Sequence, residues 1–399
     1  MYNIRKVTED LYWIGSSDRR LALFENVYPI PQGVAYNSYV LTDKQTVLFD
    51  TVDSAIAARF FENLRQILNG KPLDYMVINH MEPDHCSQIA NIMREYPSVK
   101  IVCNTKTKQM IEQFFPQTYA EETFLLIKEG DTLSTGNHEL TFIFAPMVHW
   151  PEVMLTFDKT TGTLFSADAF GTFGALNGNI FADEVDFEKD YLDEARRYYT
   201  NIVGKYGQQV QMLLKKASAL NIGMICPLHG FIWRQNLQFI LEKYNKWSAY
   251  EPEEKGVVIA YGSIYGNTEN AAEILASKLA EQGVKNIKMY DVSVTHPSYI
   301  ISECFKYSDL IFAASTYNAG IFVNMENLLH DIIAHNLQNR KIFLIDNGSW
   351  APIAGKQMRE LLQGLKNCNI SENTISIKSA LQENQISALE QMAKEIALP

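Results

Sequence analysis

The pattern of apolar and polar positions divides the chain into two halves of different character. From Leu11 to about Tyr250, short alternating apolar runs are interrupted by amphipathic helical segments. The run at 37–53 has turn-forming residues at its centre and therefore predicts a β-hairpin. Strands and helices mixed in this way predict a layered α/β domain. Further strands are expected at 75–80, 99–104 and 139–146, a second pair of strands joined by a turn at 153–168, and helices at 54–68 and 189–220.

In the second half, strand and helix signals alternate regularly. Five strand–helix units with short connections predict a doubly wound parallel sheet, whose ligand binds at the carboxyl ends of the strands. A polar, proline-containing segment at 251–256 separates the halves, so we expect domains at 1–250 and 251–399. The expected strands are 256–263, 286–293, 309–316, 341–348 and 374–381, and the helices are 267–283, 298–307, 325–337, 355–367 and 386–397.

Composition and charge narrow the class of protein. The 399 residues are 47% hydrophobic and carry a formal net charge of -11, which argues against a nucleic-acid partner. We find neither a signal peptide nor an apolar run of roughly 18 residues, so no membrane span is expected and a cytoplasmic protein is predicted. The five cysteines include no CxxC pair, which argues against a disulfide framework and a thiolate iron site.

The stretch NHMEPDHC at 79–86 concentrates metal-ligand residue types at a predicted strand-to-helix junction. Two histidines and two carboxylates occupy six positions, whereas helix capping would account for only one carboxylate. Three further ligand-type residues follow at strand ends or turns. The candidate metal ligands are His80, Glu82, Asp84, His85, His149, Asp168 and His229.

Three loops at the carboxyl ends of the second-half strands carry a different set of residues. Hydroxyls and backbone N–H groups leading into a helix at 263–268 suit a phosphate, although helix capping would also use Asn267 or Thr268. Tyr317 and Trp350 could enclose a flat heteroaromatic ring or cover the local core. The candidate cofactor residues are Ser263, Ile264, Tyr265, Gly266, Asn267, Thr268, Ser315, Thr316, Tyr317, Asn318, Ala319, Gly320, Asn347, Gly348, Ser349 and Trp350.

Each half resembles a known family. The second half is similar to the flavodoxins, in which these loops hold flavin mononucleotide (FMN) between aromatic side chains. The first half resembles the metallo-β-lactamase fold, an αββα sandwich with a binuclear site, except that Glu82 stands where that motif has a histidine. The added anionic oxygen favours a redox-capable pair such as iron, although zinc also accepts this ligand set.

Together the halves resemble the flavodiiron proteins over essentially the whole chain. This resemblance assigns His80, Glu82 and His149 to one iron, and the bridging position to Asp168. The other iron would be held by Asp84, His85 and His229. Cys86 departs from the family pattern, which has a small serine there, and the loop NGSW departs from a Gly-Trp-rich version.

The resemblance also implies an activity. Family members are oxidoreductases that reduce dioxygen to water, nitric oxide to nitrous oxide, or both, with electrons passing through FMN. A small redox protein such as rubredoxin is expected as donor, and a head-to-tail homodimer or a dimer of dimers is expected because the flavin of one subunit serves the partner's diiron site. The alternatives are a dinuclear zinc hydrolase of the lactonase or thioesterase type, and a non-catalytic flavin electron carrier.

Overall fold

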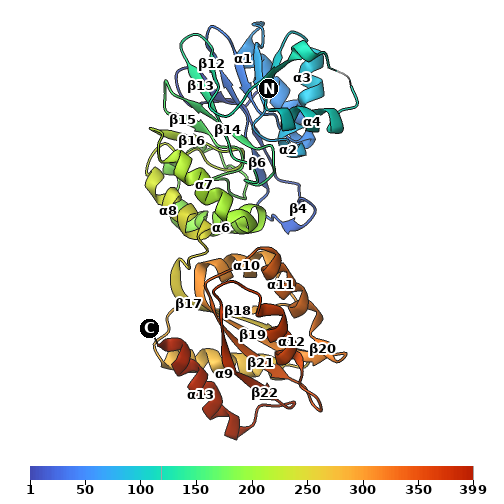
Figure 1. The fold of residues 1–399 in the computed structure, drawn as a ribbon, viewed down its shortest axis with the longest axis vertical. Helices are drawn as coiled ribbons and strands as arrows, with labels where there is room; N and C mark the ends of the chain where they lie inside the picture. The colour runs from blue at the N-terminus through green and yellow to red at the C-terminus, as the bar shows by residue number, and fades with distance from the viewer. Residues whose placement is uncertain (118, 399) are drawn as a thin grey trace. The chain divides into compact units, whose positions relative to one another are not determined.

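The computed structural model describes residues 1–117 and 119–398, which form two compact units. The first unit is Met1–Asn245 and the second begins at Lys246. The division falls inside helix α8 (Leu237–Ser248), slightly before the polar segment at which the sequence pattern places it. Each unit has its own sheets and its own core, and each is described by itself below (Figure 1).

Two mixed sheets form the first unit. Their strand orders are β1-β2-β7-β8-β9-β10-β11 and β12-β13-β14-β15-β16. Figure 1 shows helices α1, α3 and α4 on one side of these strands and α6, α7 and α8 on the other, which is the expected αββα arrangement. The strands are β1 (Arg5–Lys6), β2 (Leu11–Trp13), β7 (Tyr39–Leu41), β8 (Val47–Phe49), β9 (Tyr75–Val77), β10 (Lys100–Cys103), β11 (Phe124–Leu126), β12 (Thr132–Ser134), β13 (Glu139–Phe144), β14 (Met154–Asp158), β15 (Thr163–Phe165) and β16 (Met224–Cys226).

The hairpins expected in the first unit are confirmed. β7 pairs antiparallel with β8, with Tyr39 opposite Phe49, and β14 pairs antiparallel with β15. Short two-stranded pairs lie outside the main sheets, among them β3 with β6. The remaining elements include β3 (Ser16–Asp18), β4 (Leu23–Phe24), β5 (Tyr28–Pro29), β6 (Val34–Tyr36), α1 (Ala57–Leu68), α2 (Pro83–Cys86), α3 (Ile89–Glu95) and α4 (Thr105–Phe114).

The prediction of a single long helix at 189–220 is wrong. The segment instead contains α5 (Phe187–Asp190), α6 (Leu192–Tyr198), a π-helical turn (Tyr199–Val203), a 3-10 turn (Gly204–Tyr206) and α7 (Gly207–Ala217). The side chains of Thr200 and Asn201 both donate to the Arg197 carbonyl, at 3.3 and 2.7 Å. Such side-chain bonds compete with regular helical pairing, and two nearby glycines weaken it further.

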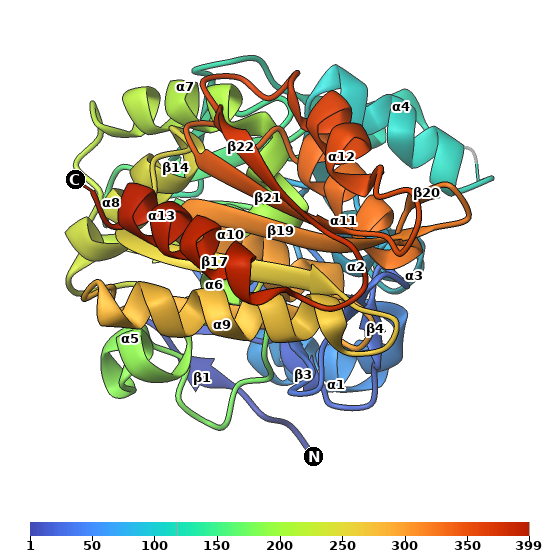
Figure 2. The ribbon, with the colours of Figure 1, turned by 90° about the horizontal axis from the view of Figure 1, so that it is seen from below.

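The second unit has the predicted doubly wound sheet. Its parallel strands follow the order β18-β17-β19-β21-β22, which is the flavodoxin-like order 2-1-3-4-5. Figure 2 shows α9 and α13 on one face of this sheet and α11 and α12 on the other. The elements are β17 (Glu254–Gly262), α9 (Asn267–Glu281), β18 (Ile287–Asp291), α10 (Pro297–Lys306), β19 (Tyr307–Tyr317), α11 (Val323–Ala334), β21 (Lys341–Asn347), α12 (Ala354–Leu362), β22 (Asn369–Ile377) and α13 (Ile386–Ala397).

One detail of this sheet differs from the sequence pattern. The segment expected to be a loop at 315–320 continues β19 as far as Tyr317 and then turns into the short strand β20 (Gly320–Ile321). β20 pairs antiparallel with β19, so a sixth strand joins the expected five. The left-handed residues Asn318 and Ala319 form the turn. Asparagine tolerates this conformation but alanine rarely adopts it, so the pair gives a weaker signal than Asn-Gly would.

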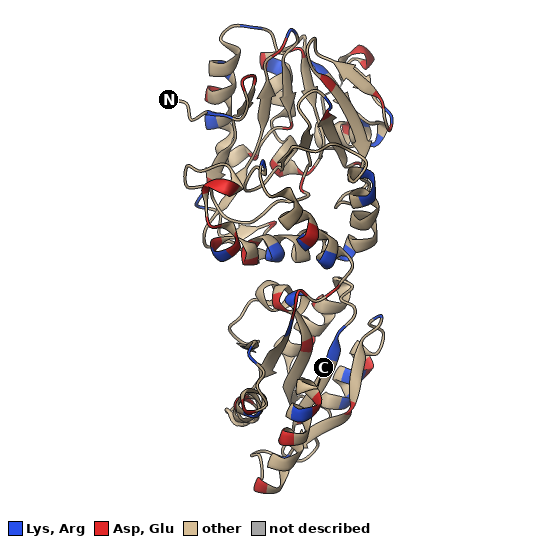
Figure 3. Ribbon diagram, turned by 90° about the vertical axis from the view of Figure 1, so that its left-hand side faces the viewer, with Lys and Arg blue, Asp and Glu red and all other residues tan. Residues whose placement is uncertain are grey.

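Charged residues of both signs are mixed along the helices and strands of both units (Figure 3). Lys278, for example, pairs with Glu281 of its own helix, α9, and with Glu390 of α13 in the second unit. Among the described helices, none is both long and apolar enough to cross a membrane.

Candidate metal centre and flavin pocket

The NHMEPDHC stretch lies where β9 ends and α2 begins. Glu82 is the residue before the helix, and Asp84 and His85 lie within its single turn. The buried Asp50 carboxylate fixes the backbone between β9 and α2, because it accepts hydrogen bonds from the backbone N–H groups of Asn79 and His80, at 2.7 and 3.2 Å. The short helix therefore projects its side chains from a backbone that is anchored on the preceding strand.

One cluster of ligand atoms forms around His80, Glu82, His149 and Asp168. All four side chains are buried, and one ligand atom from each lies within 4.8 Å of the others. Nε2 of His149 is 3.0 Å from Oε2 of Glu82 and 3.1 Å from Oδ2 of Asp168. Nε2 of His80 lies 3.3 Å from the same Glu82 oxygen. Two imidazoles and two carboxylates thus converge on one point.

A second cluster forms around Asp84, His85 and His229. Their ligand atoms also lie within 4.8 Å of one another, and the two Nε2 atoms are 3.1 Å apart. Oδ1 of Asp168 is 3.0 Å from Nε2 of His85, whereas its Oδ2 faces the first cluster. One carboxylate therefore presents an oxygen to each cluster, which is the geometry of a bridging ligand. The structure brings together all seven candidate metal ligands.

The charge balance of the site fits cations. Both carboxylate oxygens of Asp84 and Oδ1 of Asp168 are buried without a hydrogen-bond partner among the described residues. Burial disfavours the imidazolium form, but nearby Asp168, Glu152 and Glu82 raise the pKa of His80 well above its ordinary value. Burial likewise opposes ionisation of Asp168, yet His85 and His80 hold its pKa well below the usual range. Buried carboxylates that lack donors are expected to bind metal ions.

A pocket of about 480 Å³ opens onto both clusters. Glu82 and Asp84 form part of its wall, so a small molecule in the pocket can reach both metal positions. Burial and the neighbouring Glu82 raise the pKa of Glu25 to about 8. The lining residues are Leu21, Leu23, Phe24, Glu25, Asn26, Tyr36, Asp53, Glu82, Pro83 and Asp84.

Several residues that support the candidate metal ligands were not predicted from the sequence. Oε1 of the buried Glu152 is 2.8 Å from Nδ1 of His80, and Nδ1 of His229 donates to the Ala35 carbonyl at 2.8 Å. The side chain of Tyr198 is buried beside His229, with 5.5 Å between ring centroids. Among these residues, only Glu152 gives a sequence signal, because it is an acid in the segment HWPE, which begins with the candidate ligand His149. A backbone acceptor such as Ala35 gives no sequence signal.

A second pocket, of about 510 Å³, lies at the carboxyl ends of the second-unit strands. Gly266, with φ of +88°, turns the chain into α9, and its N–H donates to Ser263 Oγ at 3.0 Å. The Thr268 and Ser315 hydroxyls are 2.8 Å apart, so two of the predicted loops meet there. Hydroxyls and N–H groups beside this helix start suit a phosphate.

Fourteen of the sixteen predicted cofactor residues line this pocket, while Gly266 and Gly320 shape its turns. Tyr317 and Trp350, the two aromatic residues predicted to enclose a flat ring, both line the pocket, and Trp350 and Tyr265 are about nine-tenths exposed on its rim. Thr316 also caps α12, because its hydroxyl accepts from the N–H groups of Ile353 and Ala354. Ala351, Ile353 and Ser379 line the pocket but were not predicted. Ser379 follows the fifth parallel strand, whose loop lacked a conspicuous motif.

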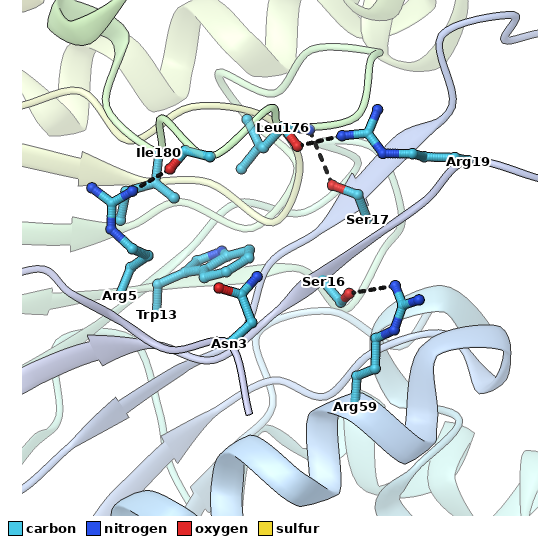
Figure 4. Close-up of a pocket in the computed structure, with 10 residues that line it drawn as sticks. Asn3, Arg5, Trp13, Ser16, Ser17, Arg19, Arg59, Leu176 and Ile180 are labelled. Atoms are coloured by element: carbon cyan, nitrogen blue, oxygen red, sulfur yellow. Dashed lines mark hydrogen bonds between the residues drawn. The ribbon is translucent and has the colours of Figure 1, made fainter. Parts of the chain in front are cut away.

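A third, smaller pocket of about 150 Å³ lies near the N-terminus of the first unit (Figure 4). Arg19 donates to the Leu176 carbonyl at 2.7 Å, and the Leu176 N–H donates to Ser17 Oγ at 3.0 Å. Arg5 similarly contacts the Gly178 carbonyl. These contacts hold β1 and β3 against the loop at 176–178, so Arg5 and Arg19 serve the fold.

The two units match two protein families. Residues 34–230 match the ODP family beta lactamase, and residues 259–384 match Flavodoxin. A rubredoxin oxygen:oxidoreductase from Desulfovibrio gigas has a TM-score of 0.92 and 27% identity, covering 99% of this chain and 98% of that one. A flavo di-iron protein from Thermotoga maritima has a TM-score of 0.88 and 26% identity, covering 99% and 100%.

A relative that this chain matches over most of its length decides the family. The anaerobic nitric oxide reductase flavorubredoxin of Shigella flexneri is 30% identical over 384 residues, which are 95% of this chain and 78% of that protein. The chain belongs to the flavodiiron protein family. The family and fold predicted from the sequence are therefore confirmed, and this flavodiiron chain is an oxidoreductase with sites for a non-haem diiron centre and FMN.

Proposed function

We propose that this flavodiiron chain reduces dioxygen to water, nitric oxide to nitrous oxide, or both. Two iron ions would be held by the seven clustered ligands, and FMN by the pocket of the second unit. Together the metal pair and the flavin supply up to four electrons, enough to take dioxygen to water, whereas coupling two nitric oxide molecules needs two. The observation that carries the proposal is the carboxylate of Asp168, which faces both ligand clusters in a chain that also has the flavin pocket.

The chain's own residues define what happens to the gas. Glu82 and Asp84 connect the 480 Å³ pocket with the metal positions, so a diatomic molecule can approach both at once. His80, His85 and His229 are fully buried, so bulk water does not reach these imidazoles from the surface. Glu25 lines the same pocket beside Glu82, so its carboxyl is a group that can exchange a proton with a molecule held there.

Electrons would come from a small redox protein, for which rubredoxin is the proposed type. The relative from D. gigas carries rubredoxin in its name, and the S. flexneri relative is a flavorubredoxin. The five cysteines are free thiols, four of them buried, which supports a reducing compartment and thus a cytoplasmic location. Reduction of the flavin by purified rubredoxin, followed at its visible absorption band, tests the donor.

A head-to-tail homodimer, or a dimer of such dimers, is the proposed assembly. Tyr265, Trp350 and Ile264 expose apolar surface around the flavin pocket, and clustered exposed apolar side chains are typical of protein interfaces. Gel filtration combined with small-angle scattering should give a dimer or tetramer. A monomer with full gas-reducing activity would contradict this assembly.

Metal analysis and turnover together test the proposed function. The purified chain should contain about two irons and one FMN. After anaerobic reduction, it should consume added dioxygen or nitric oxide. Each gas is offered in turn, and the rates and the persistence of activity identify the preferred one. Two zinc ions with lactone or thioester hydrolysis would instead support the hydrolase, and flavin reduction without gas consumption would support the electron carrier.

A further inference from the structure

The two metal positions offer the same kinds of direct ligand. Each has two imidazoles and one carboxylate of its own, from Glu82 in one position and Asp84 in the other. Asp168 presents one oxygen to each position. Ligand type and number therefore cannot make one position bind a metal more tightly than the other.

The groups behind the imidazoles do differ. Nδ1 of His80 is 2.8 Å from the carboxylate of Glu152, whereas Nδ1 of His229 is 2.8 Å from the neutral carbonyl of Ala35. Nδ1 of His85 is buried and has no hydrogen-bond partner among the described residues. A charged acceptor thus stands behind one position, while the other has a neutral acceptor behind one ring and none behind the second.

Glu152 is held rigidly for this contact. Its side chain is 1% exposed, and its Oε1 also accepts the Met81 N–H at 2.8 Å. Its own carbonyl accepts from Nδ2 of Asn104 at 2.6 Å. The carboxylate therefore cannot swing away from His80, and it fixes the ring with Nδ1 as donor and Nε2 free to bind a metal.

We propose that Glu152 is a positioning residue that makes the His80–Glu82–His149 position the tighter of the two metal positions. A carboxylate behind an imidazole raises the basicity of the ligating nitrogen and holds the ring in place, and loss of such a group typically costs about 10- to 100-fold in metal affinity. This inference rests on the proposed function only in that both positions bind divalent metals.

A double-mutant cycle with Co²⁺ as the probe tests the ranking. Glu152→Gln keeps the shape of the side chain but replaces the anion with an amide, the type of acceptor that His229 already has. In the Asp84→Asn background, which retains only the first position intact, Glu152→Gln should weaken Co²⁺ binding about 10- to 100-fold. In the Glu82→Gln background, which retains only the second, it should change binding less than about twofold. Binding is followed by the visible absorption of Co²⁺ added to the metal-depleted, full-length chain.

Asp158→Asn is the matched control, because Asp158 is a buried carboxylate 2.8 Å from Nδ1 of His138 and lies outside both ligand clusters. It should leave Co²⁺ binding unchanged in both backgrounds. Glu152→Asp retains the anion with a shorter reach, so it should restore part of the lost affinity, and it replaces Glu152→Gln in the cycle if that variant fails to fold by circular dichroism.

Equal effects of Glu152→Gln in the two backgrounds, or no effect in the first, would overturn the proposal. The Co²⁺ titration involves no gas turnover. A chain that binds Co²⁺ in the predicted order but consumes neither gas would therefore refute the proposed function alone.

Discussion

Oδ1 of Asp168 lies 3.0 Å from Nε2 of His85, while the other oxygen of the same carboxylate faces the opposite ligand cluster. Replacing this residue with asparagine leaves one neutral oxygen and an N–H₂ group, which cannot bridge two cations. We expect Asp168→Asn to bind fewer than two irons per chain, and we expect its rate of gas reduction to fall by about 100-fold or more.

Iron per chain, measured colorimetrically beside protein concentration, checks this prediction. Asp158→Asn serves as the control, since it removes a buried carboxylate that is not a candidate ligand. An Asp168→Asn chain that retains two irons and normal turnover would show that the carboxylate is no bridge.

The exposed aromatic ring of Trp350 should contribute to flavin affinity. It is 90% exposed on the rim of the second-unit pocket, where a flat ring could stack against it. Aromatic stacking is worth about 1 kcal/mol beyond area burial, so Trp350→Ala should weaken FMN binding by roughly fivefold or more. Fluorescence titration of the flavin-free chain measures the change. Tyr2→Ala removes another exposed aromatic outside the pocket and should have no effect.

His138 should make stability depend on pH. Its two ring nitrogens each lie 2.8 Å from a carboxylate, Asp10 on one side and Asp158 on the other. Burial lowers the pKa of His138, but the two carboxylates raise it by more, so the pKa in the folded protein lies above its ordinary value. The stabilisation is therefore complete below the unfolded value of about 6.5 and is lost as the pH rises through the higher folded pKa.

Denaturant unfolding of the wild type and His138→Gln tests this sign. The loss of unfolding free energy caused by the substitution should be larger at about pH 6 than at about pH 9. A difference that is constant over this range would mean that folding does not shift the pKa of the histidine.

Arg340 is a buried cation that satisfies backbone carbonyls at the end of α10. It donates to Cys304 O and Phe305 O at 2.8 and 2.7 Å, and to Tyr250 O at 2.7 Å. Truncation leaves several buried acceptors unpaired, so Arg340→Ala should destabilise the second unit by about 3 kcal/mol or more. Arg340→Lys should recover only part of this, because lysine lacks the planar fork of donors. Thermal unfolding, monitored through the release of flavin, measures the stability of both variants. Equal stability of Arg340→Ala and Arg340→Lys would contradict the role of the planar guanidinium.

The sequence was sufficient for the parts of the fold and site that depend on local patterns. Alternating apolar runs predicted the hairpin of Tyr39 and Phe49, and regular strand–helix alternation predicted the doubly wound sheet. The seven candidate metal ligands could be predicted because two histidines and two carboxylates occupy six positions of NHMEPDHC, and the resemblance to the flavodiiron proteins adds His149, Asp168 and His229.

The remainder depends on contacts between distant segments. The Ala35 carbonyl behind His229 is a backbone group 194 residues away, and no side-chain type announces it. The break at Tyr199–Val203 results from side chains that compete for one carbonyl within an otherwise helical pattern. The sixth strand arises from a turn through Asn318 and Ala319, in which Ala319 adopts a left-handed conformation that alanine rarely takes.

Product analysis after a single turnover tests the central claim most directly. The anaerobically reduced chain, loaded with iron and FMN, is mixed with dioxygen or nitric oxide while flavin oxidation, hydrogen peroxide and nitrous oxide are measured. We predict rapid flavin oxidation in both cases, with nitrous oxide formed from nitric oxide and with no hydrogen peroxide formed from dioxygen. His80→Asn should lower the rate of flavin oxidation about 100-fold. Stoichiometric peroxide from dioxygen and no nitrous oxide from nitric oxide, at rates unaffected by His80→Asn, would contradict the account.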